Sequence, residues 1–295
     1  MSIGVIGAGK WGSALAFAFS EKNDVFITSR TPRDVKNFVS LEKALECEYL
    51  IIAIPAQQIA SWLDERFVFK GQKVLVVSKG IEASTGRFLN EIYSQYVPDE
   101  NIAFLSGPSF AVEVMKSLPT ALVVNSTNEK LSLEFASLFP SFIKSYTSTD
   151  VVGAEIAGAY KNVIAIAAGI CEGLGLGNNA AAALISRGLV EMQRFGLSYG
   201  AREDTFTGLG GAGDLFLTAS SSMSRNFRVG LGLAKAQTQE QILNDLGEVA
   251  EGIGTAYALH EISKRKDLYL PIAKEVYEML EGKNPRESLK DLLSR

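Results

Sequence analysis

The sequence is poor in the residues that bind metals or form disulfides. Its 295 residues include one histidine, His260, and two cysteines, Cys47 and Cys171, which lie far apart without a CxxC partner. A histidine-ligated metal cluster and a zinc finger are therefore excluded, and we expect no metal site. The cysteines are expected to be free thiols in a reducing compartment. His260 falls in a helical pattern and is expected to be structural.

The sequence also lacks an excess of positive charge and a clear membrane signal. A formal net charge of −4 gives the chain no overall basic surface for nucleic acid or anionic lipid. No signal-peptide pattern opens the sequence, and the apolar run around Lys161 is interrupted by charged and amide residues. We therefore expect a cytoplasmic protein with no integral membrane segment and no nucleic-acid partner. Its length predicts two domains.

The N-terminus carries the pattern of a dinucleotide-binding loop. Residues Ser2 to Ile6 predict a short buried strand, and Gly7, Gly9 and Gly12 follow in G-x-G-x-x-G spacing before a helical run. The first glycine permits the tight turn, the second lets the backbone approach a pyrophosphate, and the third lets the helix pack against the strand. The phosphates would bind at the helix N-terminus, where free N–H groups favour anions.

The end of the second predicted strand, residues 25–28, bears on the choice of cofactor. A site that prefers NAD usually has Asp or Glu about 20 residues after the glycines, to bind the ribose 2′-hydroxyl. Here that place is taken by Ser29, Arg30 and Arg33. Because arginine suits a 2′-phosphate, the sequence favours NADP(H), with NAD(H) left open.

Further buried strands predict a doubly wound, mostly parallel sheet in a dinucleotide-binding domain over residues 1–149. They are expected at residues 49–54, 74–77, 102–105, 121–124 and 143–147. Lys79 follows one of these strands, and Gly107 and Ser109 follow the next, where a helix would open. Ligands bind at the carboxyl edge of such sheets, so these three residues are candidate substrate contacts. An ordinary loop lysine is the alternative for Lys79.

From residue 150 to 295 helical patterns replace strands, which predicts a separate, all-helical substrate-binding and catalytic domain. One helix over residues 153–170 is rich in Ala and Ile and contains Lys161 and Asn162. Lys161 shares a helical face with Ala165 and Ala168, so a small molecule could approach its ammonium closely. Either Lys161 is the functional group of this helix, or its charged end reaches solvent at a domain surface.

A second polar group lies in residues 208–230, which we expect to form a glycine-rich loop. Its hydrogen-bonding side chains are Asp214, Thr218, Ser224, Arg225 and Asn226. Arginine forks onto phosphate while hydroxyl and amide groups fix orientation, so this loop suits a small polyhydroxy phosphate. A solvated polar loop without a ligand is the alternative.

Six blocks of the sequence resemble those of bacterial NAD(P)-dependent glycerol-3-phosphate dehydrogenases, in that family's order. They are GAGKWG, SKGIE, LSGPSFAVEV, AYKNVIAIAAGI, SRNFRVG and VAEGIGT, and the likeness runs nearly end to end. The resemblance implies an α/β fold with a Rossmann-type N-terminal domain and an all-helical C-terminal domain, of the 6-phosphogluconate dehydrogenase kind. It also implies an oxidoreductase that interconverts dihydroxyacetone phosphate and sn-glycerol 3-phosphate with NAD(P)H and supplies phospholipid synthesis.

The resemblance also implies roles for individual residues. Lys161 would be the proton donor and acceptor, and desolvation together with a nearby Lys79 cation would bring its pKa nearer neutrality. The phosphorylated triose substrate would be contacted by Lys79, Gly107, Ser109, Lys161, Asn162, Asp214, Thr218, Ser224, Arg225 and Asn226. The cofactor would be contacted by Gly7, Gly9, Lys10, Trp11, Gly12, Arg30, Lys79, Ala111, Arg225, Val249 and Glu251.

One departure from the family and two rival functions qualify this assignment. Only TPRDVKNFVSLEKALECE separates the second strand from the strand at 49–54, where family members carry a longer helix and strand, so we expect a trimmed nucleotide-facing edge.

The first rival is a related Rossmann and helical dehydrogenase that acts on a hydroxyacid. The second is a non-catalytic NAD(P)-sensing module. The oligomeric state is left open, with a homodimer as one option.

Overall fold

The computed structural model describes residues 1–293, and contacts divide the chain into two compact units. The sheet unit comprises Met1–Ser78 and Asn90–Ala154, and the helical unit comprises Lys79–Leu89 and the chain from Glu155 onward. No pattern in the sequence predicted that residues 79–89 belong with the helical unit. The expected division at residues 149 and 150, as a boundary between independently folding domains, stays a prediction.

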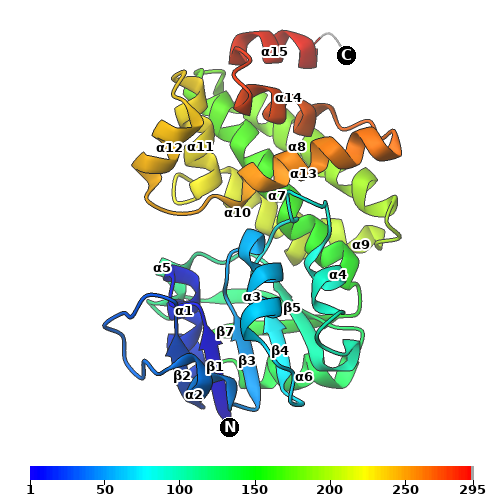
Figure 1. Ribbon diagram of the computed structural model, residues 1–295. Coiled ribbons are helices and arrows are strands. Elements are labelled where there is room, and N and C mark those ends of the chain that lie inside the picture. Colours follow the sequence, from blue (N-terminus) through cyan, green and yellow to red (C-terminus); the bar gives the residue numbers. More distant parts are fainter. Residues whose placement is uncertain (294–295) are drawn as a thin grey trace. The chain divides into compact units, whose positions relative to one another are not determined.

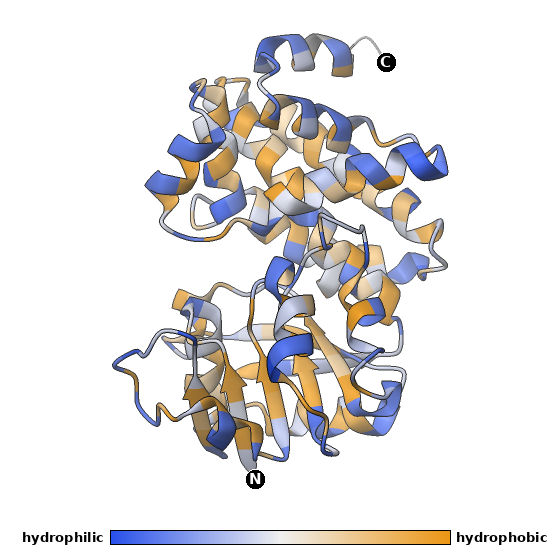
Figure 2. Ribbon diagram, in the orientation of Figure 1, coloured by the Kyte–Doolittle hydropathy of each residue, from blue (hydrophilic) through white to orange (hydrophobic). Residues whose placement is uncertain are grey.

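A seven-stranded sheet forms the centre of the sheet unit, in the order β2-β1-β3-β4-β5-β6-β7 (Figure 1). The strands are β1 Ser2–Ile6, β2 Asp24–Thr28, β3 Tyr49–Ile52, β4 Lys73–Val76, β5 Ile102–Ser106, β6 Thr120–Asn125 and β7 Ile143–Ser148. Every strand expected from the sequence is present, with ends shifted by at most a few residues. Strands β1, β3, β4 and β5 are buried almost throughout because both faces of the sheet are covered there, and they read as largely hydrophobic runs (Figure 2). In β7, at the edge of the sheet, only Ile143 is buried.

Helices cover both faces of this sheet. They are α1 Lys10–Phe19, α2 Leu41–Leu45, α3 Ile59–Arg66, α4 Leu89–Tyr93, α5 Ala111–Val114 and α6 Glu129–Leu138, with 3-10 turns at Ala56–Gln58 and Asp99–Asn101. α1 and α6 share one core, in which Phe19 stacks on Phe139 with ring centroids 4.6 Å apart. β1 pairs with both β2 and β3, so the order of the strands reverses beside the end of β1. A doubly wound sheet binds its ligand at that point.

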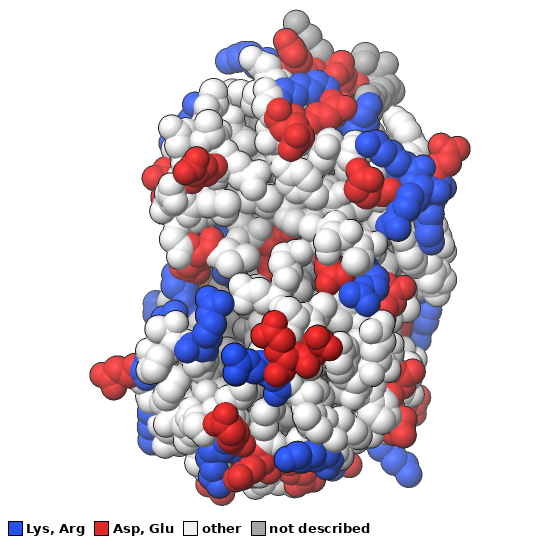
Figure 3. Space-filling model, in the orientation of Figure 1, with Lys and Arg blue, Asp and Glu red and all other residues white. Residues whose placement is uncertain are grey.

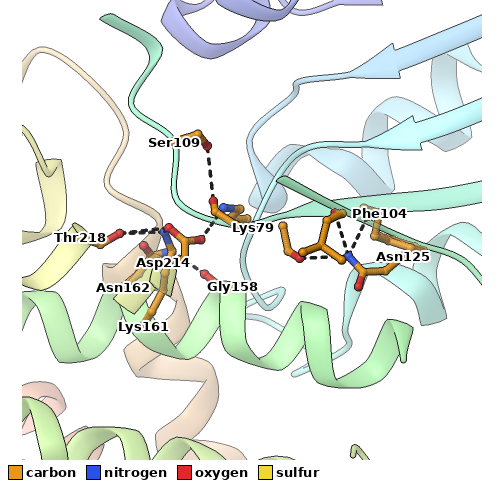
Figure 4. Close-up of polar contacts among 12 residues, drawn as sticks. Lys79, Phe104, Ser109, Asn125, Gly158, Lys161, Asn162, Asp214 and Thr218 are labelled. Carbon is orange, nitrogen blue, oxygen red and sulfur yellow. Dashed lines mark hydrogen bonds and ion pairs between the residues drawn. The ribbon is translucent and has the colours of Figure 1, made fainter. Parts of the chain in front are cut away.

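The sheet is parallel except between β5 and β6, and a buried amide marks the exception. Asn125 is 1% exposed, and its Nδ2 donates to the Phe104 carbonyl at 3.0 Å and to Ser106 Oγ at 3.0 Å (Figure 4). A buried amide donor needs such partners, so Asn125 fits the register in which β6 runs against β5. The expectation of a mostly parallel sheet is thus confirmed.

The helical unit is built around α7, Val151–Gly173. The other helices are α8 Gly177–Leu197, α9 Glu203–Thr207, α10 Asp214–Ala219, α11 Arg225–Ala234, α12 Gln239–Leu246, α13 Glu251–Lys266, α14 Pro271–Leu280 and α15 Pro285–Leu293. Among the described residues, α7 is the one helix long and apolar enough to cross a membrane, and 89% of that window is buried inside the protein. This burial is the reason for its composition: α7 is apolar because other helices surround it.

Residues 208–230 are mostly helical, so the expectation of a loop is wrong. A π-helical turn at Leu209–Gly213 runs directly into α10, and α11 starts after a short irregular stretch. Glycines and hydroxyl side chains made the segment look irregular, but tertiary packing overrides their weak helix propensity. Several polar residues that looked like loop ligands therefore lie on helices or cap them.

The structure also describes the two cysteines and the histidine. Cys47 and Cys171 are both free and buried. His260 stacks on Tyr277 with ring centroids 3.5 Å apart, and burial lowers its pKa, which fits a structural role. Figure 3 shows basic side chains gathered at the C-terminal end of α13, whose last turn carries Lys264, Arg265 and Lys266. Cations are favourable there because that end of a helix is negative.

Candidate active site

Lys161 is buried in the middle of α7 and hydrogen-bonded at its charged end. Its residue is 6% exposed, and its Nζ donates to the Asp214 carboxylate and, at 2.8 Å, to Thr218 Oγ1 (Figure 4). These are its hydrogen-bond partners among residues 1–293. An ammonium has three N–H groups, so one remains for a substrate oxygen. The alternative in which the charged end reaches solvent is not what the structure shows.

Asp214 is the common partner of two lysines. Its Oδ1 accepts from Lys161, its Oδ2 accepts from Lys79 Nζ at 2.6 Å, and Thr218 Oγ1 donates to Oδ1 at 3.3 Å. The carboxylate is 1% exposed and would be costly to bury without these partners. The structure therefore brings together Lys79, Lys161, Asp214 and Thr218, which we call the lysine–aspartate cluster.

The π-helical turn before α10 positions Asp214. Such turns are rare and occur often at functional sites. A side chain at Gly211 would collide with the Phe206 backbone, so the turn can form only with glycine there. Asp214 then starts α10, and Thr218 follows one turn later on the same face, which explains why both reach Lys161 Nζ.

Burial controls the protonation of the lysine–aspartate cluster. Desolvation lowers the pKa of Lys161 to about 8; the Asp214 charge raises it, and the neighbouring Lys79 cation lowers it further. Burial alone would raise the pKa of Asp214, but attraction to Lys161 and then to Lys79 leaves it below its ordinary value. Asp214 is thus ionised at neutral pH, whereas Lys161 can both hold and release a proton near that pH.

Lys79 reaches Asp214 across the surface of α7. Its Cγ and Cδ lie 3.3 Å and 3.4 Å from where a Cβ on Gly158 would stand. A glycine inside a helix is unfavourable, and here it makes room for the lysine stem. Gly158 was not among the residues predicted for the site, although a glycine three places before Lys161 in a helix is a signal of close approach.

The remaining polar candidates of the helical unit stand on α7 and at the start of α11. Asn162 is buried and donates to the Gly158 carbonyl at 3.2 Å, and Asn226 Oδ1 accepts from Gly252 N at 3.0 Å. Ser224 caps α11 by accepting from Phe227 N at 3.2 Å. Arg225 is more exposed than the others, and its Nη1 lies 3.6 Å from Glu248 Oε2.

α7 and α11 cross in backbone contact. A side chain at Gly169 would collide with the Phe227 carbonyl, and one at Gly230 would collide with the Ile166 carbonyl. These two glycines therefore fix how closely the helix that carries Lys161 approaches the helix that begins at Ser224. In the sequence, Gly230 was noted only as the last residue of the block SRNFRVG, and the crossing of the two helices was not predicted.

The sheet unit carries a loop that fits a dinucleotide. Gly7 has φ +113°, which only glycine adopts readily, and a side chain at Gly12 would collide with the Gly7 carbonyl. Gly9 has open space where a Cβ would stand, so a phosphate can approach its backbone. Gly9 caps α1 with no side-chain hydrogen bond, and the first turn holds no acidic residue. The N–H groups of α1 can therefore bind a pyrophosphate.

Other candidates of the sheet unit are spread around this loop. Trp11 and Ala111 pack partly buried against the core that α1 shares with the sheet. Arg30 is exposed just beyond β2, in a stretch without helix or strand that leads to α2. Lys10, the first residue of α1, is also exposed.

The proposed ligand sets are divided between the two units. Gly107, which has φ +109°, and Ser109, whose Oγ donates to the Gly107 carbonyl at 3.4 Å, belong to the sheet unit, as do the glycine loop, Arg30 and Ala111. Val249, which is 43% exposed, and Glu251, in the first turn of α13, belong to the helical unit with Lys79 and Arg225. The contacts assigned to these residues stay predictions.

Comparisons with known proteins identify the family. Residues 150–290 match the family described as NAD-dependent glycerol-3-phosphate dehydrogenase C-terminus. Residues 25–132 match the family described as NAD-dependent glycerol-3-phosphate dehydrogenase N-terminus. The chain is 74% identical over 292 residues to a glycerol-3-phosphate dehydrogenase (NAD(P)+) from Sulfurimonas denitrificans, with 99% of each chain covered. It is 62% identical over 295 residues to one from Nitratiruptor sp., covering 100% of this chain and 99% of the other.

A solved structure agrees with the sequence matches. Glycerol-3-phosphate dehydrogenase from Coxiella burnetii superposes with a TM-score of 0.92 at 30% identity, over 100% of this chain and 99% of that one. The agreement extends through both the sheet unit and the helical unit. The chain therefore belongs to the NAD-dependent glycerol-3-phosphate dehydrogenase family.

Proposed function

We propose that the protein is an oxidoreductase that interconverts dihydroxyacetone phosphate and sn-glycerol 3-phosphate with NAD(P)H. The lysine–aspartate cluster carries this proposal, because it gives a buried lysine a pKa of about 8 and an N–H free for a substrate oxygen. The family membership of the chain supplies the substrate class: curated relatives are named glycerol-3-phosphate dehydrogenases.

Lys161 moves the proton of this reaction. During reduction carbon 2 gains a hydride, the carbonyl π pair moves onto the oxygen, and that pair takes a proton from the Lys161 ammonium to form the O–H bond of the alcohol. During oxidation the neutral amine takes that proton back. Asp214 and Thr218 hold Nζ in place, so that Lys161 meets the reacting oxygen without a search among rotamers.

The bound nicotinamide supplies or accepts the hydride at carbon 2. The chain's part in holding it is to offer the α1 N-terminus and the open backbone at Gly9 to the pyrophosphate. Arg30, exposed beyond β2, would pair with a 2′-phosphate, so NADP(H) is accepted at least as well as NAD(H). No carboxylate stands in its place to exclude that phosphate.

The phosphate of the substrate is assigned to the start of α11. Arg225 is accessible enough to fork onto it, and Ser224 and Asn226 offer hydroxyl and amide groups beside it. Anchoring the phosphate away from the reacting carbon provides orientation. We assign the buried amide of Asn162 to the substrate hydroxyls, as the resemblance to the family implies.

Turnover of purified protein tests the proposal. NADPH oxidation should be fast with dihydroxyacetone phosphate and slow with unphosphorylated dihydroxyacetone and a panel of short ketoacids. Preference for a ketoacid would support the hydroxyacid dehydrogenase instead. Tight NADPH binding without turnover of any of these compounds would support the NAD(P)-sensing module.

Three further assignments complete the proposal: the use of the product, the location of the enzyme and its oligomeric state. The product would supply phospholipid synthesis, and the enzyme would work in the cytoplasm, where its substrate and reduced cofactor are found. A homodimer would cover apolar side chains on α8 such as Val190, which is 53% exposed, and Leu197, which is 48% exposed. Sedimentation of the purified protein measures its mass in solution, and a monomer at micromolar concentration would contradict the dimer.

A further inference from the structure

Residues 79–89, here the 79–89 segment, leave the sheet after β4 and join the helical unit. The ring of Phe88 contacts two other aromatic rings. Its centroid lies 6.4 Å from that of Phe195, in the last turn of α8, and 5.1 Å from that of Tyr199, just after α8. Arg265 of α13 donates from Nη2 to the Thr85 carbonyl at 3.4 Å. Lys79 is the first residue of this segment, so its backbone is carried by the helical unit.

A buried carboxylate organises the interior of the segment. The Glu82 side chain is 10% exposed, and its Oε2 accepts from Arg87 Nη2 at 3.0 Å and from the Thr85 hydroxyl. The backbone closes around the same residues: Glu82 N donates to the Arg87 carbonyl at 3.0 Å, and Gly86 N donates to the Glu82 carbonyl at 2.8 Å. An isolated bridge joins Ile81 to Phe88.

These contacts favour one conformation of the segment. The Glu82 carboxylate is buried, whereas the Arg87 side chain is 35% exposed. Separating the two leaves the buried carboxylate uncompensated, so alternative conformations that do so are penalised. The turn also requires glycine at residue 86. Gly86 has φ +73°, a backbone conformation that residues with a side chain rarely adopt.

The conformation of the segment decides where the Lys79 ammonium lies. Gly80 alone separates Lys79 from the bridged residue Ile81, which is fully buried. The Lys79 stem then passes Gly158 and ends 2.6 Å from Asp214 Oδ2. A small rearrangement of the segment would therefore withdraw the ammonium from the carboxylate.

We infer that Glu82 is a positioning residue that acts through Lys79: it holds the 79–89 segment so that the Lys79 ammonium is delivered to Asp214. This inference rests on the proposed function, because its readouts are turnover of the proposed substrates. Arg87 and Thr85 share the role as partners of the Glu82 carboxylate. Glu82 itself touches neither substrate nor cofactor in this assignment.

Glu82→Gln should lower kcat/KM for dihydroxyacetone phosphate by roughly 10- to 100-fold, the scale of a misplaced catalytic group. It should also move the pH profile of glycerol 3-phosphate oxidation. The charges acting on Lys161 are Asp214 from α10 and Lys79 from the segment, and Lys79 opposes the ammonium form. Withdrawal of Lys79 therefore shifts the rising limb of kcat/KM to higher pH. A merely structural loss would scale the profile without shifting it.

A double-mutant cycle with Lys79→Ala tests the route of the effect. If Glu82 acts through Lys79, adding Glu82→Gln to Lys79→Ala changes neither kcat/KM nor the pH profile further. Equal losses in both backgrounds would overturn the inference, as would a Glu82→Gln enzyme with normal kinetics. Arg87→Met provides a second route to the same answer if Glu82→Gln folds poorly, because it removes the cation and leaves the carboxylate in place.

Glu275→Gln is the matched control. Glu275 is also a buried carboxylate of the helical unit, paired with Lys283 at 2.6 Å, but it lies in α14 outside the segment. It should lower the melting temperature comparably while leaving the pH profile unchanged. If the wild-type protein turned over neither dihydroxyacetone phosphate nor glycerol 3-phosphate, the proposed function would be refuted. If the enzyme were active and the losses of kcat/KM from Glu82→Gln and Lys79→Ala were additive, only the role of Glu82 would be refuted.

Discussion

Two kinds of cation occupy the helical unit, and they differ in burial. The Lys161 side chain is 8% exposed and pairs with Asp214, whereas the Arg225 side chain is 43% exposed and lies 3.6 Å from Glu248. The first environment is dry enough to change the pKa of an ammonium. The second leaves the charge hydrated and open to an incoming anion.

The difference matches the chemistry assigned to each cation. A lysine can release its proton when it is desolvated, but a guanidinium keeps its proton at any pH that the protein meets. We therefore propose that the buried cation transfers the proton and that the exposed cation binds the phosphate. Exchanging the residue types would place a fixed charge where a proton must move.

The largest effect should come from Lys161→Ala, with turnover lowered by ~10²–10⁴-fold, the usual range for a positioned proton-transfer group. The fold should survive because Asp214 keeps Lys79 as a counter-ion and alanine favours the helix. Lys161→Arg should restore little activity. Turnover, NADPH affinity and melting temperature of both variants check this. An active Lys161→Arg enzyme would mean that charge at this place matters and proton transfer does not.

Arg225→Ala should raise KM for dihydroxyacetone phosphate by roughly 10- to 100-fold, as expected for losing a hydrogen bond to a charged group. The value of kcat should change less, because the reacting oxygen is assigned to Lys161. Initial rates across substrate concentrations provide both constants. Arg202→Ala is the control: its side chain is 57% exposed and pairs with Asp204, and it should leave KM unchanged. Equal effects of the two substitutions would remove Arg225 from the phosphate site.

The pH dependence should reflect the Lys161 pKa of about 8. Oxidation needs the amine, so kcat/KM for glycerol 3-phosphate should rise about tenfold per unit below pH 8 and level off above it. Reduction needs the ammonium, so its kcat/KM should fall above pH 8. Rate profiles in both directions measure this. Profiles that bend at the ordinary lysine value of 10.5 would contradict a desolvated Lys161.

The smallest effect concerns the cofactor. Arg30→Asp should shift preference toward NADH by roughly tenfold, since it removes a cation from the 2′-phosphate and adds a carboxylate for the ribose hydroxyl. The comparison is the ratio of kcat/KM for NADPH and NADH. Lys130→Asp makes the same change of charge at an exposed position on α6 and should leave the ratio alone. A wild-type enzyme that strongly prefers NADH would refute the assignment of Arg30.

Local patterns predicted most of the fold. Strands such as Tyr49–Ile52 are buried on both faces and so read as unbroken apolar runs. The reversal of β6 against β5 depends on pairing across the sheet, so the sequence could not specify it. The same holds for residues 79–89, whose partners Phe195 and Arg265 are far away in the chain.

The candidate site was predictable in its members but not in its connections. Lys161, Asp214 and Thr218 were all singled out, yet Lys161 and Asp214 are separated by 53 positions and only the fold shows that they pair. The π-helical turn at Leu209–Gly213 looked like a loop because its glycines have low helix propensity. Glu82 was noted only as part of SKGIE, since burial of a carboxylate cannot be read from its neighbours.

The contact between α7 and α11 at Gly169 and Gly230 has a consequence for substrate size. Because backbone meets backbone there, the separation between Lys161 and the start of α11 is fixed by the main chain, and repacking side chains will not alter it. Under the proposed assignments of Lys161 to the reacting carbon and Arg225 to the phosphate, this fixed separation sets the length of substrate that the site accepts. To accept a longer phosphorylated ketone, these glycines would have to be substituted so that α7 and α11 move apart, which would lower the stability of the protein.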